Sequence, residues 1–169
     1  MFFNKKCPSC RAKNPQNATT CSSCGALFKS GKANSPKSIK DHDEAIRLDP
    51  QNAEAYYKRG FAYQKMGESE MAIEDFDRAI RIDPEFAMAY SNRGYAYLNK
   101  EQYDRAVVDC TKAINLNPGD AVAYLNRGTA YRLQGNTAEA TAELEKAISL
   151  SENTRLIKLA NKQIQEIAR

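Results

Sequence analysis

The 169-residue chain has no tryptophan and a single histidine, His42. One histidine argues against most histidine-based catalysis, although carboxylate and cysteine chemistry stay open. No apolar run approaches the roughly 18 residues that cross a bilayer, and the first residues lack the apolar core of a signal peptide. We therefore expect a protein of the cytoplasm that makes no membrane contact.

The sequence also lacks the common constellations of catalytic residues. Its eight glycines are spread along the chain and do not gather in a phosphate-binding loop. No serine or cysteine stands in a recognisable nucleophile–base pattern, and the acidic residues are dispersed. We therefore predict that the chain is not an enzyme.

Charge and cysteine are unevenly distributed along the chain. Residues 1–40 contain eight Lys or Arg and no Asp or Glu, whereas residues 41–169 contain 17 basic and 21 acidic residues. Four of the five cysteines lie between Cys7 and Cys24, and Cys110 stands apart. Both distributions divide the chain into a short N-terminal segment and a longer remainder.

The short segment carries two Cys-x-x-Cys pairs, Cys7 with Cys10 and Cys21 with Cys24. This spacing is typical of a tetrahedral thiolate site, because each tight turn directs two sulfurs at one ion. The string KKCPSCRAKNPQNATTCSSCGALF resembles the short zinc-ribbon modules of many bacterial and archaeal proteins. So short a segment would draw most of its folding free energy from the metal. We predict a zinc ribbon over residues 1–28 with a structural Zn²⁺, and the spacing alone leaves iron open.

Other roles for these cysteines fit the sequence less well. A redox Cys-x-x-Cys motif calls for a βαβ context, and a disulfide calls for an oxidising compartment; the sequence signals neither. Four thiolates close the coordination shell of zinc, whereas a catalytic zinc keeps a position open for water. The pattern therefore favours a structural metal.

Basic side chains surround the cysteines and suggest a second role for this segment. Contacts with phosphates are predicted for Lys5, Lys6, Arg11 and Lys13. The simpler interpretation is a solvated basic segment that continues into the polar linker 29–35. Association with nucleic acid through the ribbon and linker is thus an alternative function.

From residue 36 onward the chain repeats with a period of 34 residues. The units 51–84, 85–118 and 119–152 align on Pro50, Pro84 and Pro118. Each unit holds two stretches of about 14 residues with apolar side chains at helical spacing, separated by turn residues. No single unit can bury its apolar face, so the units must stack.

The first halves of the units, AYYKRGFAYQKMG, AYSNRGYAYLNKE and AYLNRGTAYRLQG, resemble the tetratricopeptide repeat (TPR) family. The resemblance implies an all-α helical solenoid over residues 36–169. We expect a half-repeat at 36–50 that begins with a helix start at Ser35–Pro36, then the three full repeats, then a capping helix at 153–169. His42 and Cys110 fall at packing positions, so we expect both to be buried.

One regular feature departs from the family pattern. Arg59, Arg93 and Arg127 occupy a position that is usually leucine. Sixteen residues later stand the acidic residues Asp75, Asp109 and Glu143. We predict that each arginine pairs with an acid across two helices, within its unit or between neighbours, because a guanidinium suits a partly buried bidentate pair. The alternative is that the arginines face the groove and grip an acidic ligand.

The resemblance also implies that the first helices of successive units line a concave groove. The predicted groove residues are Tyr57, Lys58, Phe61, Met88, Asn92, Tyr95, Leu98, Leu125, Asn126 and Arg132. Many of them are apolar, and apolar side chains displayed on a concave surface suggest ligand binding. The alternative is that several of them cover neighbouring turns or the capping helix.

Some TPR proteins grip the C-terminal carboxylate of heat-shock chaperones through a set of Lys, Asn and Arg side chains. Asn92 matches the central asparagine of that set. The other four positions hold Tyr57, Phe61, Val122 and Asn126. We therefore do not expect a chaperone clamp of that kind.

Together these patterns predict a non-catalytic adaptor or scaffold. It binds a peptide or protein segment in the concave TPR groove, and the zinc ribbon offers a second contact surface. We expect a protein or peptide partner and a monomeric chain.

Overall fold

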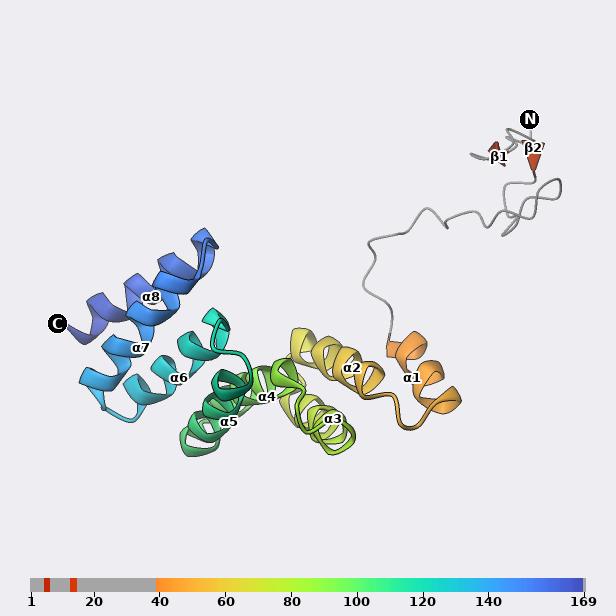
Figure 1. Cartoon of the computed structure of the whole chain (residues 1–169), viewed down its shortest axis with the longest axis horizontal. Helices are drawn as coiled ribbons and strands as arrows, with labels where there is room; N and C mark the ends of the chain where they lie inside the picture. Colours follow the sequence, from red (N-terminus) through yellow and green to blue (C-terminus); the bar gives the residue numbers. More distant parts are fainter. Residues whose placement is uncertain (1–4, 7–12, 15–38, 169) are drawn as a thin grey trace. The chain divides into compact units, whose positions relative to one another are not determined.

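The computed structural model describes residues 5–6, 13–14 and 39–168, which fall into two units divided between residues 37 and 38. The first unit contains β1 (Lys5–Lys6) and β2 (Lys13–Asn14), which pair antiparallel with Lys6 opposite Lys13. The second unit is helical (Figure 1). The predicted linker 29–35 and the predicted helix start at Ser35–Pro36 lie outside the described residues.

The helical unit consists of a single helix, three helix pairs and a final helix. In chain order these are α1 (Ile39–Leu48), α2 (Ala53–Met66), α3 (Ser69–Ile82), α4 (Ala87–Asn99), α5 (Tyr103–Leu116), α6 (Ala121–Leu133), α7 (Thr137–Leu150) and α8 (Thr154–Ile167). The predicted all-α solenoid, with its half-repeat, three full repeats and capping helix, is confirmed. Within the described ranges, no helix combines the length and the apolar character needed to cross a membrane.

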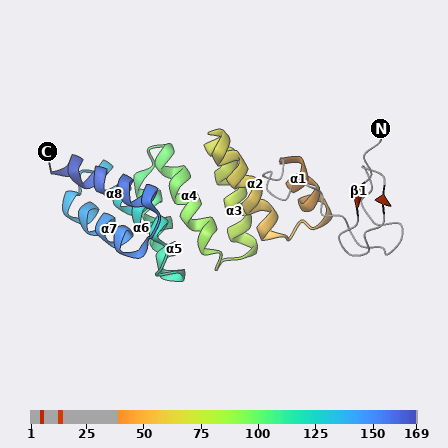
Figure 2. The same cartoon turned by 90° about the horizontal axis from the view of Figure 1, so that it is seen from above.

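The helices stack in chain order along the array (Figure 2). Each helix of a pair contacts its partner, and each second helix also contacts the first helix of the next pair. In addition α2 contacts α4, α4 contacts α6 and α6 contacts α8, so the first helices and α8 form a row of their own. Figure 1 shows α3 and α5 along the lower, outer side of this row.

Polar caps and left-handed residues set the ends of the helices. The Asn52 side chain accepts a hydrogen bond of 2.9 Å from the Ala55 amide and begins α2, since a side-chain oxygen can satisfy a free amide there. The turns after α2 and α6 contain Gly67 and Gly135, with φ of 82° and 84°. The equivalent residue after α4 is Glu101, with φ of 59°, a conformation that glycine adopts more readily.

Glycine at the helix crossings lets the two helices of each pair approach closely. A Cβ atom added at Gly60 would lie 3.0 Å from the Phe76 ring, and one at Gly94 would lie 2.7 Å from the Cys110 sulfur. At Gly128 the equivalent distance to Leu144 is 3.0 Å. Phe76, Cys110 and Leu144 are the largest fully buried side chains of the described residues. The predicted burial of Cys110 is thus confirmed.

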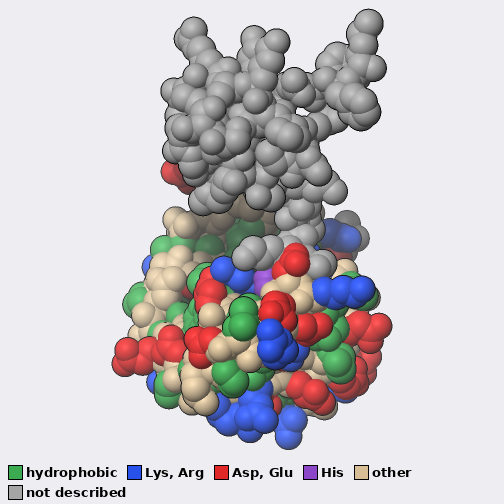
Figure 3. Space-filling view, turned by 90° about the vertical axis from the view of Figure 1, so that its right-hand side faces the viewer, with side chains coloured by type: hydrophobic (Ala, Val, Ile, Leu, Met, Phe, Trp, Pro, Cys, Tyr) green, Lys and Arg blue, Asp and Glu red, His purple; other side chains and the backbone are tan. Residues whose placement is uncertain are grey.

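Both ends of the helical unit are packed as predicted. At the C-terminal end, Leu156 and Ala160 of α8 join the core cluster that contains Leu144 and Ala147. At the other end, His42 is 6% exposed, which confirms its structural position. Figure 3 looks onto the α1 end, where acidic, basic and apolar side chains are interspersed.

The three regularly spaced arginines form ion pairs within their own units. Arg93 donates two hydrogen bonds of 2.7 Å to the Asp109 carboxylate. Arg59 and Asp75 form the same bidentate pair at 2.8 and 2.6 Å, and Arg127 and Glu143 do so at 3.1 and 2.7 Å. The prediction of a pair across two helices is confirmed.

The same arginines also reach back to the preceding second helix. Arg59 donates to Asp43 at 2.7 Å, Arg93 donates to Asp77, and Arg127 donates to Thr111 at 3.0 Å. Each of these partners lies sixteen residues before its arginine. Each guanidinium therefore bonds two second helices, that of its own unit and the preceding one. The alternative in which the arginines grip a ligand in the groove is wrong.

Candidate peptide-binding groove

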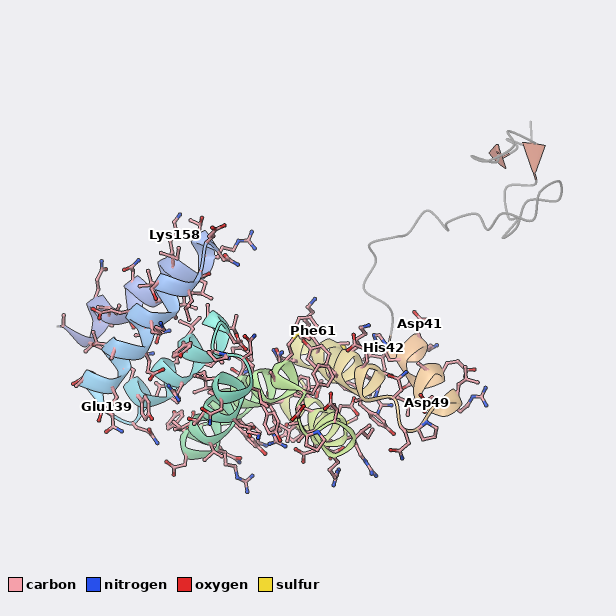
Figure 4. All side chains as sticks on the ribbon, viewed as in Figure 1. Asp41, His42, Asp49, Phe61, Glu139 and Lys158 are labelled. Atoms are coloured by element: carbon pink, nitrogen blue, oxygen red, sulfur yellow. The ribbon has the colours of Figure 1, made fainter. Side chains whose placement is uncertain are left out.

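The row of first helices presents the surface on which the sequence predicts a groove. The second helices α3, α5 and α7 contact this row from its other side. Figure 4 shows Phe61 on the side of α2 that faces away from α3. A side chain at this position is free of the helix-pair core, so it can line the groove.

An aromatic cluster occupies the α2 end of this surface. The Tyr57 ring stacks on Phe61, with ring centroids 6.3 Å apart and planes 17° apart. It also contacts Phe86 at 4.9 Å and Phe76 at 5.9 Å. The Lys65 ammonium lies 4.5 Å from the centroid of the Phe61 ring, a cation–π contact. Tyr57 is thus half-buried and packs against three aromatic rings.

Asn92 links α4 to α2 through a network of side-chain hydrogen bonds. Its amide donates to the Met88 carbonyl at 2.9 Å and to the Tyr57 hydroxyl at 3.3 Å. It accepts a hydrogen bond of 3.3 Å from the Gln64 amide. Burial raises the pKa of Tyr57, Glu54 adds to the shift and Asn92 opposes it, so the phenol stays neutral.

The carbonyl oxygen of the same Gln64 amide has no partner among the described residues. This Oε1 atom is buried. Buried acceptors normally find a donor, so an atom of this kind calls for an explanation. The network therefore contains one buried acceptor without a partner, on the residue that bonds Asn92.

Exposed apolar side chains follow the row from α4 to α8. Met88 is 51% exposed and Tyr95 40%, while the predicted Leu98 is half-buried. Val122 and Leu133 of α6 are 47% and 43% exposed. Leu159 of α8, also 47% exposed, was not among the predicted groove residues. The 34-residue period places it in line with Leu125, which is buried, so the period alone could not have found it.

Two predicted groove residues are buried instead. Leu125 is 7% exposed and belongs to the core cluster with Leu144 and Leu156. Asn126 is 5% exposed and donates a hydrogen bond of 3.3 Å to the Ser91 carbonyl. Both side chains hold neighbouring helices together and have little surface left for a ligand.

The three basic side chains predicted or found at this surface already have partners. Lys58 forms an ion pair of 2.7 Å with Glu54, and Lys65 lies over the Phe61 ring. Arg132 donates to the Gln163 side chain at 3.2 Å and lies 3.6 Å from the Glu166 carboxylate. Lys58 and Arg132 thus have acidic partners, whereas the exposed Lys65 contacts only an aromatic ring and keeps its charge.

The sites predicted for the N-terminal segment are described only in part. Cys7, Cys10, Cys21, Cys24 and Arg11 lie outside the described residues. Lys5 and Lys6 form β1, and Lys13 is the first residue of β2. The antiparallel pairing of Lys6 with Lys13 brings together the two ends of the stretch whose sequence contains Cys7 and Cys10.

Family models match both parts of the chain. Models described as tetratricopeptide repeat match residues 53–86, 87–120 and 110–142, and a TPR-repeat model matches residues 34–67. A zinc-ribbon domain model matches residues 6–27. These matches confirm both resemblances that the sequence suggested. A search of curated protein sequences finds no match.

Several solved structures are similar to the helical unit. The Arabidopsis OM64 TPR domain is 30% identical, with a TM-score of 0.63, over 68% of this chain and 94% of that domain. The second TPR domain of human RPAP3, in complex with the HSP70 peptide SGPTIEEVD, is 33% identical, with a TM-score of 0.63, over 69% and 95% of the two chains. The second TPR of Spaghetti (RPAP3), bound to the HSP90 peptide SRMEEVD, is 36% identical over 64% and 99%, with a TM-score of 0.58.

Proposed function

The chain belongs to the tetratricopeptide repeat family and carries an N-terminal zinc-ribbon domain, and from this premise we propose that it is a non-catalytic adaptor. Its ligand is a segment of a partner protein, which lies along the row formed by α2, α4, α6 and α8. We call this surface the groove; its proposed ligand-facing residues are Tyr57, Phe61, Met88, Asn92, Tyr95, Leu98, Val122, Leu133 and Leu159.

The observation that carries this proposal is the exposure of apolar side chains along the groove. Met88, Tyr95 and Leu159 each leave 40% or more of their surface open, although they stand on helices with well-packed cores. Exposed apolar groups that follow one another along a surface can mark an interaction site, and α4, α6 and α8 carry five of them, whereas α3, α5 and α7 carry one each, Met71, Val108 and Leu150. Two RPAP3 domains with similar folds were solved with bound peptides, which is consistent with this role.

We propose that the zinc ribbon holds one structural Zn²⁺ and acts as a second contact surface. Cys7, Cys10, Cys21 and Cys24 supply four sulfur donors in two Cys-x-x-Cys pairs, the donor set that tetrahedral zinc prefers. β1 and β2, which flank the first pair of cysteines in the sequence, pair antiparallel. When bound, the ion would supply folding free energy and no chemistry.

A second candidate function is association with nucleic acid through the N-terminal segment. Residues 1–40 contain eight basic residues and no acidic one, which favours phosphate contacts by Lys5, Lys6, Arg11 and Lys13. Such binding would weaken steeply between about 50 and 200 mM salt, because counterions are released when lysines neutralise phosphates.

Affinity capture with the full-length, zinc-loaded chain separates the two functions. We would compare the unaltered protein with Tyr95→Ala and with a variant in which Lys5, Lys6, Arg11 and Lys13 are all alanine, before and after nuclease treatment. The adaptor function predicts partner proteins that survive nuclease and high salt and are lost from Tyr95→Ala. Partners that are lost from the lysine and arginine variant or after nuclease treatment, and are retained by Tyr95→Ala, would contradict it.

A further inference from the structure

We propose that the outer face of α8 binds an acidic helix of a partner protein, which continues the array beyond its last described helix. This face lies at the end of the array opposite α1 (Figure 2). It carries Arg155, Lys158, Leu159 and Lys162, and we call it the end face. The end face adjoins the groove at Leu159 but is a separate surface, so the inference goes beyond the adaptor role of the groove.

The first argument is a packing position that is covered in the earlier units and open on α8. Ser91, Leu125 and Leu159 are spaced 34 residues apart and occupy equivalent positions. Ser91 is 3% exposed, and its carbonyl accepts from Asn126 of α6; Leu125 is 7% exposed and shares a core cluster with Leu156 of α8. Leu159 is 47% exposed, and among the described helices α8 contacts only α6 and α7. Because a helix of the next unit closes this position in both covered cases, a helix is the shape that fits the end face.

The second argument is the charge of the end face. Arg155, Lys158 and Lys162 follow one another at spacings of three and four residues, so they lie on one side of the helix. All three are exposed, and Lys158 lies at the outer edge of the array (Figure 4). Within the part of the chain that the structure describes, no carboxylate pairs with Arg155 or Lys158. The carboxylate of Glu166 lies 3.8 Å from Lys162 and also 3.6 Å from Arg132. The end face thus presents three cations with little internal compensation.

Other exposed cations of the helical unit stand closer to acidic residues. On α3, Glu74 and Asp77 each precede an exposed arginine, Arg78 or Arg81, by four residues, the spacing at which opposite charges on a helix attract. In α8, residues 154–165 contain no acidic residue. This local excess of positive charge favours an acidic partner over an uncharged or basic one.

The third argument is that these charges do not stabilise α8 itself. A helix is stabilised by acidic residues in its first turn and by basic residues in its last turn, because of its dipole. The helices α1, α2 and α3 follow this rule. In α8 the order is reversed, since Arg155 lies in a first turn without an acidic residue and Glu166 lies in a last turn without a basic one. An acidic ligand at the start of α8 would offset this unfavourable arrangement.

The occupant that matches these features is an acidic, amphipathic helix of another protein. Carboxylates at three- or four-residue spacing would face the three cations, and an aliphatic side chain between them would cover Leu159. Residues 1–40 contain no acidic residue, so they do not supply such a helix. In a second copy of the chain, Asp43 and Glu44 of α1 are already bonded to Arg59 and Arg47. A foreign acidic helix is therefore favoured over a second copy.

The test uses the full-length zinc-loaded chain and a displayed library of helical peptides in which the positions of one helix face are randomised. We expect the selected peptides to carry Glu or Asp at three- or four-residue spacing and to bind more weakly at high salt, because salt screens exposed charges. Their affinity should fall by about tenfold or more in the end-face variant, which combines Lys158→Glu with Lys162→Glu. The matched control combines Lys112→Glu on α5 with Lys146→Glu on α7, which makes the same change of net charge at exposed positions. Its affinity should stay within about twofold of that of the unaltered chain.

A second variant separates loss of binding from loss of folding. Lys158→Gln combined with Lys162→Gln removes two cations without adding a carboxylate, and the affinity should fall by about threefold or more. Thermal melts of both variants should match that of the unaltered chain, because neither lysine contributes to a buried contact of α8.

Several results would overturn the inference. A selection without acidic enrichment, or equal losses of affinity in the end-face and control variants, would remove the charge argument. Loss of the selected peptides from Tyr95→Ala, with retention by the end-face variant, would place the helix in the groove. Self-association in analytical ultracentrifugation that disappears in the end-face variant would make a second copy the occupant. None of these results decides the adaptor function, which depends on nuclease-resistant partners that Tyr95→Ala loses in affinity capture.

Discussion

Arg93 on α4 grips Asp109 on α5 through two hydrogen bonds of 2.7 Å and reaches back to Asp77 on α3. One side chain thus ties together three consecutive helices. The Arg93 guanidinium carbon lies 5.5 Å from the centroid of the Tyr90 ring and 5.9 Å from that of the Tyr97 ring. Burial raises the pKa of Asp109 even though Arg93 opposes the shift, so the charged carboxylate depends on its arginine.

Replacement of this arginine should therefore be costly. Arg93→Leu leaves Asp109, whose side chain is 6% exposed, without its bidentate partner. We expect a loss of about 3–5 kcal/mol in the free energy of unfolding, because a buried charge is stranded. The measurement is urea denaturation followed by circular dichroism.

The matched control is Arg105→Leu. The Arg105 guanidinium also lies 5.5 Å from the centroid of the Tyr97 ring, but Arg105 is exposed and its side chain donates to Gln102 at 3.2 Å. Its loss should cost less than about 1 kcal/mol. Equal effects of the two substitutions would show that the ion pair with Asp109 is not what stabilises these helices.

The close crossing of α4 and α5 predicts that the effect of Gly94→Ala on stability changes sign with the residue at position 110. In the unaltered protein, Gly94→Ala should be destabilising by about 1–2 kcal/mol, because its Cβ would lie 2.7 Å from the Cys110 sulfur. In a Cys110→Ala background the same change should stabilise by up to about 1 kcal/mol, since alanine favours a helix over glycine. Thermal melts of the four proteins measure the coupling, and additive effects would refute the steric account.

The turns after the first helices allow a reciprocal test. Glu101 has φ of 59° where the equivalent residues are Gly67 and Gly135. Glu101→Gly should stabilise the chain by up to about 1 kcal/mol, because a left-handed backbone is strained for a residue with a Cβ. Gly67→Ala should destabilise it by a similar amount, although nothing lies within 4 Å of the added Cβ. Chemical denaturation of both variants checks the pair, and shifts in the same direction would contradict it.

Much of the helical unit could be predicted from the sequence, because residues of the same type recur at equivalent packing positions in all three 34-residue units. The tyrosines, glycines and alanines at fixed intervals predicted the helix pairs, and the spacing of sixteen residues predicted the pair of Arg93 and Asp109. The link from Arg93 back to Asp77 was not foreseen, even though it has the same spacing. Sequence spacing alone does not say which of two neighbouring second helices an arginine reaches.

The groove was harder to predict, because family position does not fix exposure. Leu125 and Asn126 occupy groove positions but are buried at 7% and 5% exposure, since α8 and α4 close over them. Leu159 was expected on the packing face of the capping helix with Leu156 and Ala160, but it is 47% exposed. The network of Gln64, Asn92 and Tyr57 joins two helices, so the period within one unit could not reveal it.

Removal of the metal should change the reactivity of the four N-terminal cysteines and leave the helical unit folded. Burial raises the pKa of the Cys110 thiol far above its usual range, so it should not react with dithiobisnitrobenzoate in the folded chain. A chelator should release one zinc ion and expose four reactive thiols, while the helical circular dichroism stays unchanged. Reaction of the fifth thiol should require denaturant. Loss of helical circular dichroism when the zinc is removed would contradict this assignment. So would a thiol count, measured without denaturant, that is one lower in Cys110→Ala than in the unaltered chain, because Cys110 would then react in the folded protein.

The most direct test of the adaptor proposal is site-specific photocrosslinking in the full-length chain. A p-benzoylphenylalanine is placed at Tyr95, in the groove, or at Val108, an exposed position on α5 that serves as the control. The proposal predicts nuclease-resistant protein adducts from position 95 that are absent from position 108. Adducts of equal yield at both positions, or adducts at position 95 that nuclease removes, would contradict it.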